Sequence, residues 1–353
     1  MKGIILHGGH GTRLRPLTHT GPKQLLPIAN KPMSQYCVES LIDAGITEIA
    51  IIIGGIGANK VIDYYGNGEK FNVKITYIQQ DEPKGIAHAI NLCKNFIGDE
   101  KFLVFLGDNI IQKSIKDFVN EFKNSDAEAS ILLCEVDNPT QFGIADIKNK
   151  QIIKILEKPE NPPTNLAVTG IYLLTPKIFK IIDNLKPSWR NELEITDALD
   201  SLLQQKFKII YHMITDYWKD TGTPNDILNA NGTILENMTP FFHGSEFGQN
   251  KISGNVMVGD KTIIKNNCII KGPVFIGSNC ILDGVTIGPN TSIGDNSELS
   301  ECKITNSIVM SNCNISGSMK IHNSIIAYNS SITSNQNINK QIFLLGEGTK
   351  ISI

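Results

Sequence analysis

Short runs of β-branched and other apolar residues alternate with amphipathic stretches along the first two thirds of the chain. The apolar runs predict strands over residues 3–6, 48–53, 74–78, 102–106, 130–135, 166–174 and 207–213. Apolar residues at helical spacing predict helices over residues 32–44, 85–96, 115–123 and 194–205. The alternation is typical of an α/β domain with a Rossmann-like, largely parallel or mixed sheet. Such sheets bind their ligands beyond the carboxyl ends of the strands.

From about residue 237 the helical spacing disappears and every sixth residue is apolar. The first register is Ile252, Val258, Ile264, Ile270, Ile276 and Leu282, and after single-residue slips the period resumes at Ile287, Val309 and Ile326 and runs on to Ile338. Sixteen of these last 117 residues are asparagine, which tolerates the left-handed backbone of coil corners. The pattern predicts a left-handed parallel β-helix of hexapeptide repeats, whereas an antiparallel sandwich would space its turns irregularly.

Length and charge narrow the possible functions. A chain of 353 residues is long enough for two domains of roughly 150 residues each, and we expect a catalytic domain over residues 1–236 and a β-helix over 237–353. The net charge of −2 argues against binding of a nucleic-acid backbone. Neither a signal segment nor a membrane-spanning apolar run is evident, so we expect a cytoplasmic protein without a membrane partner. The seven cysteines form no CxxC pair and are interpreted as packed residues.

A glycine-rich turn follows the first predicted strand and ends in cationic side chains. It contains Gly8, Gly9, Gly11, Thr12 and Arg13. Glycines let backbone N–H groups approach phosphate oxygens, and a guanidinium adds forked hydrogen bonds. The chain has only three arginines, and two of them, Arg13 and Arg15, lie in this turn. By itself such a turn is a weak signal, because tight turns use glycine without any ligand, and its spacing is neither GxGxxG nor GxxxxGKS.

The full string GGHGTRLRPLTHTGPKQLLPIANKP resembles the signature of the sugar-1-phosphate nucleotidylyltransferases. The resemblance continues through YIQQDEPKGIAHAI, FLGDNI, FGIADI, LEKP, AVTGIYLL, NELEITDAL and YWKDTGTPNDIL, and therefore covers essentially the whole chain. Within this family, TGPKQL and the tail after position 237 look like the long form of glucose-1-phosphate thymidylyltransferase. The resemblance implies Mg²⁺-dependent transfer of a thymidylyl group from dTTP to glucose 1-phosphate, giving dTDP-glucose and pyrophosphate for nucleotide-sugar biosynthesis.

The resemblance also implies the roles of individual residues. The catalytic set is Arg13, Lys23, Asp108, Lys158 and Asp220, with Asp108 and Asp220 as the Mg²⁺ ligands. Each aspartate alone could merely cap a turn, but two carboxylates with nucleotide oxygens and water suit Mg²⁺. The implied nucleotide-binding residues are Leu6, Gly8, Gly9, Gly11, Thr12, Arg13, Gln24, Gln80, Pro83, Gly85, Gly107 and Asp108. The implied sugar-phosphate-binding residues are Asn109, Gly143, Glu157, Lys158, Val168, Thr169, Gly170 and Trp218.

Several alternatives stay open. A glutamine amide such as that of Gln80 reads the edge that thymine and uracil share, so UTP is an alternative to dTTP. The chain departs from the family at His7, where a small residue is usual, and His7 or His10 could be a pH-sensitive phosphate contact or a tolerated neighbour of the loop. Some related architectures carry an acyltransferase site on the β-helix or have become regulatory subunits. We expect the tail to serve homo-oligomerisation.

Overall fold

The computed structural model describes residues 1–9, 11–336 and 338–353, so His10 and the side chain of Ile338 lie outside the described part. The chain forms two compact units, one from residues 1–10 and 34–220 and the other from residues 11–33 and 221–353. The expected boundary at residue 236 coincides with the end of helix α8 (Pro224–Glu236), but the units group residues 11–33 and 221–236 with the β-helix. The functional division of the chain therefore stays a prediction.

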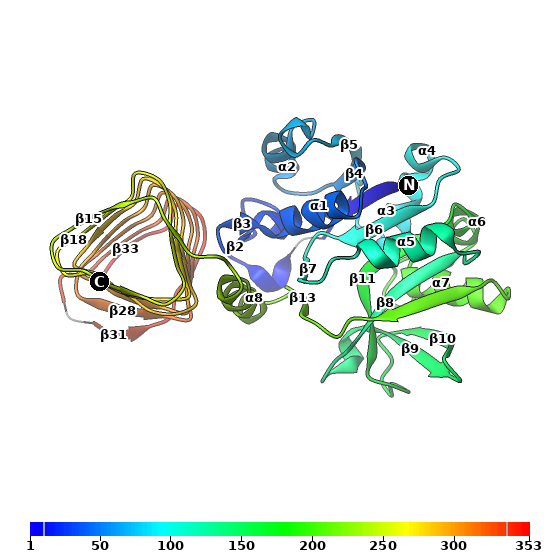
Figure 1. Ribbon diagram of the computed structural model, residues 1–353. Helices are drawn as coiled ribbons and strands as arrows, with labels where there is room; N and C mark the ends of the chain where they lie inside the picture. Colours follow the sequence, from blue (N-terminus) through cyan, green and yellow to red (C-terminus); the bar gives the residue numbers. More distant parts are fainter. Residues whose placement is uncertain (10, 337) are drawn as a thin grey trace. The chain divides into compact units, whose positions relative to one another are not determined.

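The first unit is built on a nine-stranded mixed sheet (Figure 1). Its strands are β1 (Lys2–Leu6), β4 (Glu48–Ile53), β5 (Lys74–Gln79), β6 (Phe102–Leu106), β8 (Ala129–Glu135), β9 (Gly143–Lys148), β10 (Gln151–Glu157), β11 (Leu166–Leu174) and β12 (Ile209–Met213). The order is β10-β9-β11-β6-β1-β4-β5, and β8 joins β11 to β12. β1 runs parallel to β4 and β6, whereas β11 is antiparallel to β6 and β8. The seven predicted strands are all present, and the mixed α/β class is confirmed.

Helices and short connections surround this sheet. They are α1 (Met33–Asp43), α2 (Ala58–Tyr65), α3 (Ile86–Leu92), α4 (Lys94–Ile97), α5 (Lys116–Asn124), α6 (Lys177–Ile182) and α7 (Ile195–Gln204), with the 3₁₀ turns η3 (Glu69–Phe71) and η4 (Pro139–Gln141). Ile4 and Leu6 alternate along β1 into one core with residues of α3 and α7. The helix predicted over residues 85–96 is divided into α3 and α4, and Cys93 is the C-cap of the first and the N-cap of the second.

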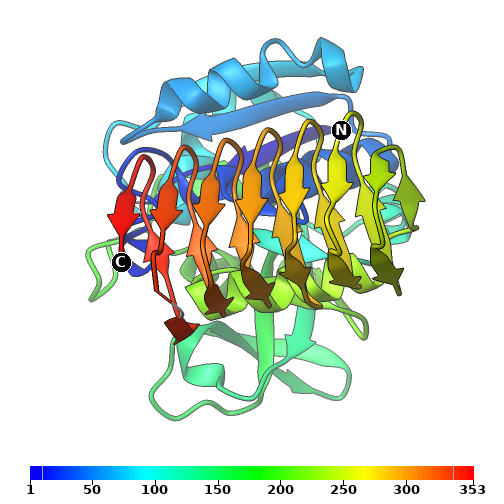
Figure 2. The same cartoon turned by 90° about the vertical axis from the view of Figure 1, so that its left-hand side faces the viewer.

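Three parallel sheets of very short strands form the β-helix of the second unit, with its coils stacked side by side (Figure 2). The first sheet contains β14 (Phe241–Phe242), β17 (Val256–Val258), β20 (Val274–Ile276), β23 (Thr291–Ile293), β26 (Ile308–Val309), β29 (Ile325–Ile326) and β32 (Leu344–Leu345). The second contains β15 (Ser245–Phe247), β18 (Ile263–Lys265), β21 (Ile281–Asp283), β24 (Glu298–Ser300), β27 (Asn314–Ser316), β30 (Ser331–Thr333) and β33 (Lys350–Ser352). The third contains β16 (Lys251–Ser253), β19 (Ile269–Lys271), β22 (Thr286–Ile287), β25 (Lys303–Thr305), β28 (Met319–His322) and β31 (Ile338–Gln341).

The apolar residues that recur every six positions point into the interior of this coil. Val258, Ile264, Ile270, Ile276 and Leu282 are fully buried, one on each successive sheet. The asparagines take the corners as predicted, with left-handed backbone at Asn266, Asn267, Asn279, Asn290, Asn296, Asn306, Asn312, Asn323 and Asn329. These observations confirm the predicted left-handed β-helix. Six cysteines are buried and Cys134 is half-buried, all as free thiols. No helix in the described part is long and apolar enough to span a membrane.

The second unit also contains a hairpin from the N-terminal part of the chain. Strands β2 (Pro27–Ile28) and β3 (Lys31–Pro32) pair through a two-residue turn in which Ala29 and Asn30 both have positive φ. Ala29 N donates to Asn231 Oδ1 of α8 at 2.9 Å, and Asn30 Nδ2 donates to the Ile293 carbonyl at 2.6 Å. Helix α8 begins with a capping box of Thr223 and Asp226. The hairpin is thus bonded both to α8 and to the coil.

Candidate active site

The glycine-rich turn begins where β1 ends and divides between the two units. Gly8 and Gly9 belong to the first unit, and Gly9 has a φ of 96°. A Cβ atom on Gly8 would lie 3.1 Å from Gln80 Oε1, so this glycine lets the turn approach the predicted base-reading side chain. Leu6 is buried, and its carbonyl accepts from the Gly107 N–H at 3.0 Å. Two pairs of predicted nucleotide contacts are therefore neighbours in the structure. One pair is Gly8 and Gln80, and the other is Leu6 and Gly107.

Gln80 is 5% exposed and is oriented by a histidine. Its Nε2 lies 3.0 Å from His88 Nδ1, and burial lowers the pKa of His88, so this ring is neutral and accepts the bond at neutral pH. Pro83 lies on the exposed loop that follows Gln80. Gly85 has a φ of 100°, and a Cβ there would lie 2.5 Å from the Leu193 carbonyl oxygen. The close approach that requires glycine at position 85 is therefore made to Leu193.

The rest of the turn belongs to the second unit. Gly11 has left-handed backbone, and its carbonyl accepts from Thr18 Oγ1 at 2.9 Å. Thr12 and Arg13 are exposed on the 3₁₀ turn η1 (Thr12–Leu14). A Cβ added to Gly222 would lie 2.9 Å from Arg13 Nη2, so this guanidinium passes over a glycine of the WKDTGT motif. Lys23 and Gln24 lie on η2 (Lys23–Leu25), with Gln24 buried. Arg13 and Lys23 therefore both belong to the segment of residues 11–33.

A cavity of about 190 Å³ in the first unit brings together most of the predicted sugar-phosphate and metal residues. The predicted residues that line it are Asp108, Asn109, Gly143, Glu157, Lys158, Val168, Gly170, Trp218 and Asp220. Trp218, which the resemblance implies as a sugar-phosphate contact, is a wall residue. Thr169 is fully buried and does not line the cavity. The cavity adjoins the carboxyl end of β6, as expected for this kind of sheet.

Asn109 organises the two carboxylates of the cavity. It begins β7 (Asn109–Ile111), which pairs antiparallel with β13 (Trp218–Asp220) so that Asp220 lies opposite Asn109. Its Nδ2 donates to Asp108 Oδ1 at 3.0 Å, and its Oδ1 accepts from Trp218 Nε1 at 2.8 Å and from Gly170 N at 3.3 Å. A Cβ on Gly170 would lie 2.8 Å from Asn109 Nδ2. Glycine is therefore required at position 170 because the amide packs against it.

Two carboxylates, one just before β7 and one at the end of β13, fit a Mg²⁺ ion, which prefers one or two protein carboxylates and completes its octahedron with phosphate oxygens and water. Asp108 and Asp220 face the same cavity from the neighbouring strand ends just described. Among the described residues no cluster of three or more His, Cys, Asp and Glu side chains could hold a metal ion by itself. A site completed by substrate oxygens therefore suits these residues better than a closed structural metal site.

Glu157 and Lys158 also line this cavity, and Glu157 belongs to a network that the sequence did not predict. Arg190 Nη1 donates to both Glu157 Oε1 and Glu194 Oε1 at 3.2 Å, and Thr196 Oγ1 donates to Glu157 Oε2 at 3.0 Å. Burial and the neighbouring Glu194 raise the pKa of Glu157. Lys158 Nζ lies 3.8 Å from Glu157 Oε1. The sequence offered one sign that Arg190 is a site residue: it is the only arginine outside the glycine-rich turn.

The backbone of Lys158 is itself unusual. It has a φ of 41°, a left-handed conformation that lysine adopts rarely, and its N–H donates to the Phe142 carbonyl at 3.0 Å. Phe142 packs edge-on against Trp218 with ring centroids 5.8 Å apart. Such backbone strain concentrates at binding sites where the surroundings hold it in place. The ammonium of Lys158 is thus anchored at the cavity by its main chain.

His7 is buried behind the turn and is not a cavity residue. It is 1% exposed, and its ring packs edge-on against Tyr65 with centroids 6.0 Å apart. Neither ring nitrogen has a hydrogen-bond partner among the described residues, and burial lowers the pKa of His7 to about 3. A neutral, enclosed imidazole does not act as a pH-sensitive phosphate contact. Of the two expected possibilities, His7 therefore fits that of a tolerated neighbour of the loop.

Comparison with known proteins agrees with this geometry. Residues 2–237 match the family model described as nucleotidyl transferase, and residues 281–352 match the model described as GMPPB C-terminal domain. The chain is 45% identical over 320 residues to the low-salt glycan biosynthesis nucleotidyltransferase Agl11 of Haloferax volcanii, covering 90% of each chain. It is 39% identical over 319 residues to glucose-1-phosphate thymidylyltransferase of Streptomyces antibioticus, covering 90% of this chain and 89% of that one.

A solved structure gives a similar result. It is a crystal structure of a protein from Bacillus anthracis, assigned as a glucose-1-phosphate thymidylyltransferase and in complex with sucrose. The two chains are 42% identical, with a TM-score of 0.64, and the match covers 70% of this chain and 98% of the other.

Proposed function

Because the chain belongs to the sugar-1-phosphate nucleotidyltransferase family and carries a C-terminal β-helix, we propose that it transfers a thymidylyl group from dTTP to glucose 1-phosphate. The observation that carries this proposal is the single cavity lined by Asp108, Asp220, Glu157 and Lys158. The glutamate offers an acceptor for sugar hydroxyls, the lysine offers an ammonium for a phosphate, and the two aspartates offer carboxylates for a metal bound to phosphate oxygens.

The reaction joins the two substrates by in-line displacement. A phosphate oxygen of glucose 1-phosphate forms a bond to the α-phosphorus of dTTP, the bond between that phosphorus and its bridging oxygen breaks, and pyrophosphate leaves with the electron pair. A sugar phosphate is largely dianionic near neutral pH, because its second pKa is about 6, and so it needs no general base. The protein's task is therefore to hold both phosphates in line and to stabilise their charge.

Each predicted residue has a role that its chemistry supports. Glu157, held by Arg190 and Thr196, accepts hydrogen bonds from sugar hydroxyls, and Lys158 stabilises the sugar phosphate. Arg13 and Lys23 stabilise the triphosphate, and the backbone N–H groups of Gly8, Gly11 and Thr12 bind its oxygens. Asp108 and Asp220 hold Mg²⁺, which when bound screens the triphosphate charge and polarises the α-phosphate. Asn109 keeps the Asp108 carboxylate oriented.

Gln80 is the proposed reader of the base. Its carboxamide can donate to O4 and accept from N3–H of thymine, and one of its two amide hydrogens is already bonded to His88. Uracil offers the same two atoms, so UTP is the second candidate nucleotide. A preference for dTTP over UTP must come from contacts to the thymine methyl group or from discrimination against the 2′-hydroxyl group of the ribose.

Pyrophosphate release tests the proposal. The full-length protein is assayed with glucose 1-phosphate and Mg²⁺ and with dTTP, UTP, CTP, GTP or ATP in parallel, and the product of each reaction is identified by mass. We expect release with dTTP, a weaker reaction with UTP, and no appreciable reaction with the other three. Release with UTP alone would replace the thymidylyl assignment by a uridylyl one. Absence of release with every nucleotide and several sugar phosphates would favour a regulatory, non-catalytic role.

A further inference from the structure

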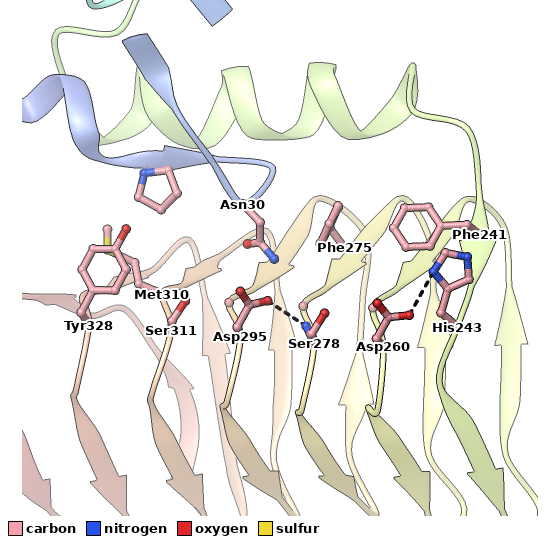
Figure 3. A pocket seen from close by; sticks show the side chains of 14 residues that line it. Asn30, Phe241, His243, Asp260, Phe275, Ser278, Asp295, Met310, Ser311 and Tyr328 are labelled. Carbon is pink, nitrogen blue, oxygen red and sulfur yellow. Dashed lines mark hydrogen bonds and ion pairs between the residues drawn. The ribbon is translucent and has the colours of Figure 1, made fainter. Parts of the chain in front are cut away.

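The β-helix unit has a second cavity, of about 380 Å³, that contains none of the site residues predicted from the sequence. Its walls are the β2–β3 hairpin and the turns that leave the coil after β17, β20, β23 and β26 (Figure 3). In the close-up, Asn30 points from the hairpin toward Asp295 and Ser278, with Phe241 and Phe275 toward one end and Met310 and Tyr328 at the other. All of these residues belong to one compact unit.

Glycines at one position of successive coils form part of the lining of the cavity. Gly259, Gly277 and Gly294 follow three neighbouring strands, and Met310 takes the equivalent position on the next coil. A Cβ on Gly277 would lie 2.3 Å from Asp295 Oδ1, so glycine is needed there for the turns to stack. All three glycines and Met310 line the cavity.

The next position of each coil supplies the polar lining. Asp260, Ser278, Asp295 and Ser311 follow the column just described. Asp295 Oδ1 accepts from the Ser278 N–H at 2.7 Å, and Asp260 Oδ1 lies 3.5 Å from His243 Nδ1. An ionised carboxylate can accept about four hydrogen bonds. Both aspartates therefore keep acceptor capacity beyond these contacts.

Aromatic rings complete the lining. Phe241 and Phe275 meet edge to face with centroids 5.8 Å apart, and Phe241 also packs against the His243 ring at 5.0 Å. Aromatic faces attract ammonium and guanidinium groups, and they also cover short aliphatic chains. No lysine or arginine lines this cavity in the described part of the chain. Carboxylates and ring faces without a fixed cation disfavour phosphates and nucleotides and favour a positively charged group.

We propose that this cavity binds a small organic dication, namely a short carbon chain with a primary amine or guanidinium group at each end. Asp260 and Asp295 accept from its charged ends, and the Phe241 and Phe275 rings cover its carbon chain. The volume lies at the lower end of the range of about 300 to 1,000 Å³ typical of small-molecule sites, which suits a ligand of this size.

Binding also acts on the hairpin that closes the cavity. Pro27 and Asn30 line the cavity, and the hairpin continues directly from the η2 turn that carries Lys23. A ligand held between hairpin and coil adds to the two bonds that Ala29 and Asn30 already make. Occupancy therefore steadies the hairpin and the segment leading to Lys23. This effect is independent of which nucleotide the enzyme uses.

Calorimetry on the full-length protein at about 0.15 M salt tests the site, because surface attraction is largely screened there. The probes are 1,5-diaminopentane, the neutral pentane-1,5-diol and inorganic phosphate. We expect the diamine to bind, and the diol and phosphate not to bind. Asp260→Asn and Asp295→Asn each remove one charge but keep an acceptor oxygen, and each should weaken diamine binding at least fivefold. The matched control is Asp283→Asn. Asp283 pairs with Lys265 on the second sheet of the coil and does not line the cavity, so this variant should change affinity less than twofold.

Three results would overturn the site: no heat from the diamine with folded protein, equal binding of the diol, or an equal loss in the Asp283→Asn variant. Hydrogen exchange of residues 23–32 tests the effect on the hairpin without any activity assay. Saturating diamine should slow exchange there at least threefold. Binding with unchanged exchange would disprove the steadying of the hairpin, and neither result depends on whether dTTP is a substrate.

Discussion

Asp220 lies directly opposite Asn109 in the pairing of β13 with β7. Asn109 in turn follows Asp108 directly in the chain. The Asn109 amide donates to Asp108, and its carbonyl oxygen accepts from the Trp218 indole. Asn109 thus orients the Asp108 carboxylate by a hydrogen bond and is the strand partner of Asp220. This arrangement makes the two aspartates act as a pair, which leads to the first prediction.

Asp220→Asn should lower kcat by about 100-fold or more, because the metal and the triphosphate lose a charged ligand at the reacting centre. The thermal unfolding midpoint should change by only a few degrees, since the amide preserves the size of the side chain. Asp216→Asn is the matched control, because Asp216 is an exposed carboxylate 3.6 Å from Lys113 and lines no part of the cavity. Similar losses in both variants would contradict a metal role for Asp220.

Arg13→Ala should reduce turnover far more than stability, because the guanidinium is exposed on η1 and is proposed to stabilise the triphosphate. We expect a loss of about 100-fold in kcat/KM for the nucleotide. Arg13→Lys should recover only part of it, because an ammonium cannot form the planar forked contact. Steady-state kinetics with Arg15→Ala as the comparison measures the effect. An Arg13→Ala enzyme with wild-type kinetics would remove this residue from the mechanism.

Arg190→Ala should raise the KM for glucose 1-phosphate at least about tenfold, because it leaves the half-buried Glu157 carboxylate and the buried Glu194 carboxylate without their shared cation. The pKa of Glu157, already raised by burial, should rise further and add a new ionisation to the pH profile of kcat/KM. Arg190→Lys should restore one contact at most. If KM and the pH profile stay unchanged, Glu157 does not need Arg190 for sugar binding.

His7 should make the folded protein sensitive to acid. Its pKa is lowered to about 3 by burial, whereas an unfolded histidine has a pKa of about 6.5, so the unfolded state binds the extra proton between these values. Stability is therefore complete above pH 6.5 and falls as the pH decreases toward 3, by up to about 1.4 kcal/mol per pH unit. Urea unfolding at pH 7 and pH 5 measures this slope.

The His7→Leu variant provides the comparison for that slope. Leucine has a similar volume, does not titrate, and removes two buried nitrogens that have no partner among the described residues. We expect the variant to lose less stability than the wild type between pH 7 and pH 5. Parallel slopes in the two proteins would show that other groups dominate acid unfolding.

Truncation after Glu236 should impair turnover as well as any assembly. From the sequence alone we expect the tail to serve oligomerisation. The structure adds that the Ile293 carbonyl bonds Asn30 and that Gly346 lies against Pro16, where an added Cβ would meet the ring at 3.3 Å. The truncated chain should therefore show a lower kcat and faster proteolysis within residues 11–33. Full activity in a truncated, folded protein would contradict this dependence.

The sequence predicted those elements whose pattern is local. The period of six reports burial directly, because each apolar residue lines the same narrow coil interior, and the corner asparagines report a backbone angle. Helix α8 escaped prediction because its interior contains Gly232 and several asparagines, whose helical conformation depends on tertiary contacts such as Gly232 against Asn290. Local propensity carries no information about such contacts.

The same limit applies to the candidate site. The motifs indicated Asp108, Asp220, Glu157 and Lys158, and these side chains do line one cavity. The bonds of Arg190 to Glu157 and Glu194 span up to 33 positions, and no periodicity encodes such a distance. The burial of His7 likewise depends on Tyr65 of helix α2, which is 58 positions away along the chain. Long-range electrostatics and packing therefore required the three-dimensional structure.

The grouping of residues 11–33 with the β-helix affects how chimeric enzymes should be designed. A recombinant junction at residue 237 would separate the hairpin from the Ile293 carbonyl and leave two halves of one folding unit in different parents. A junction set that transfers residues 11–33 together with 221–353 keeps those bonds intact. Lineages that exchanged only the last third of the gene would need compensating substitutions in the hairpin, so this segment should coevolve with the tail.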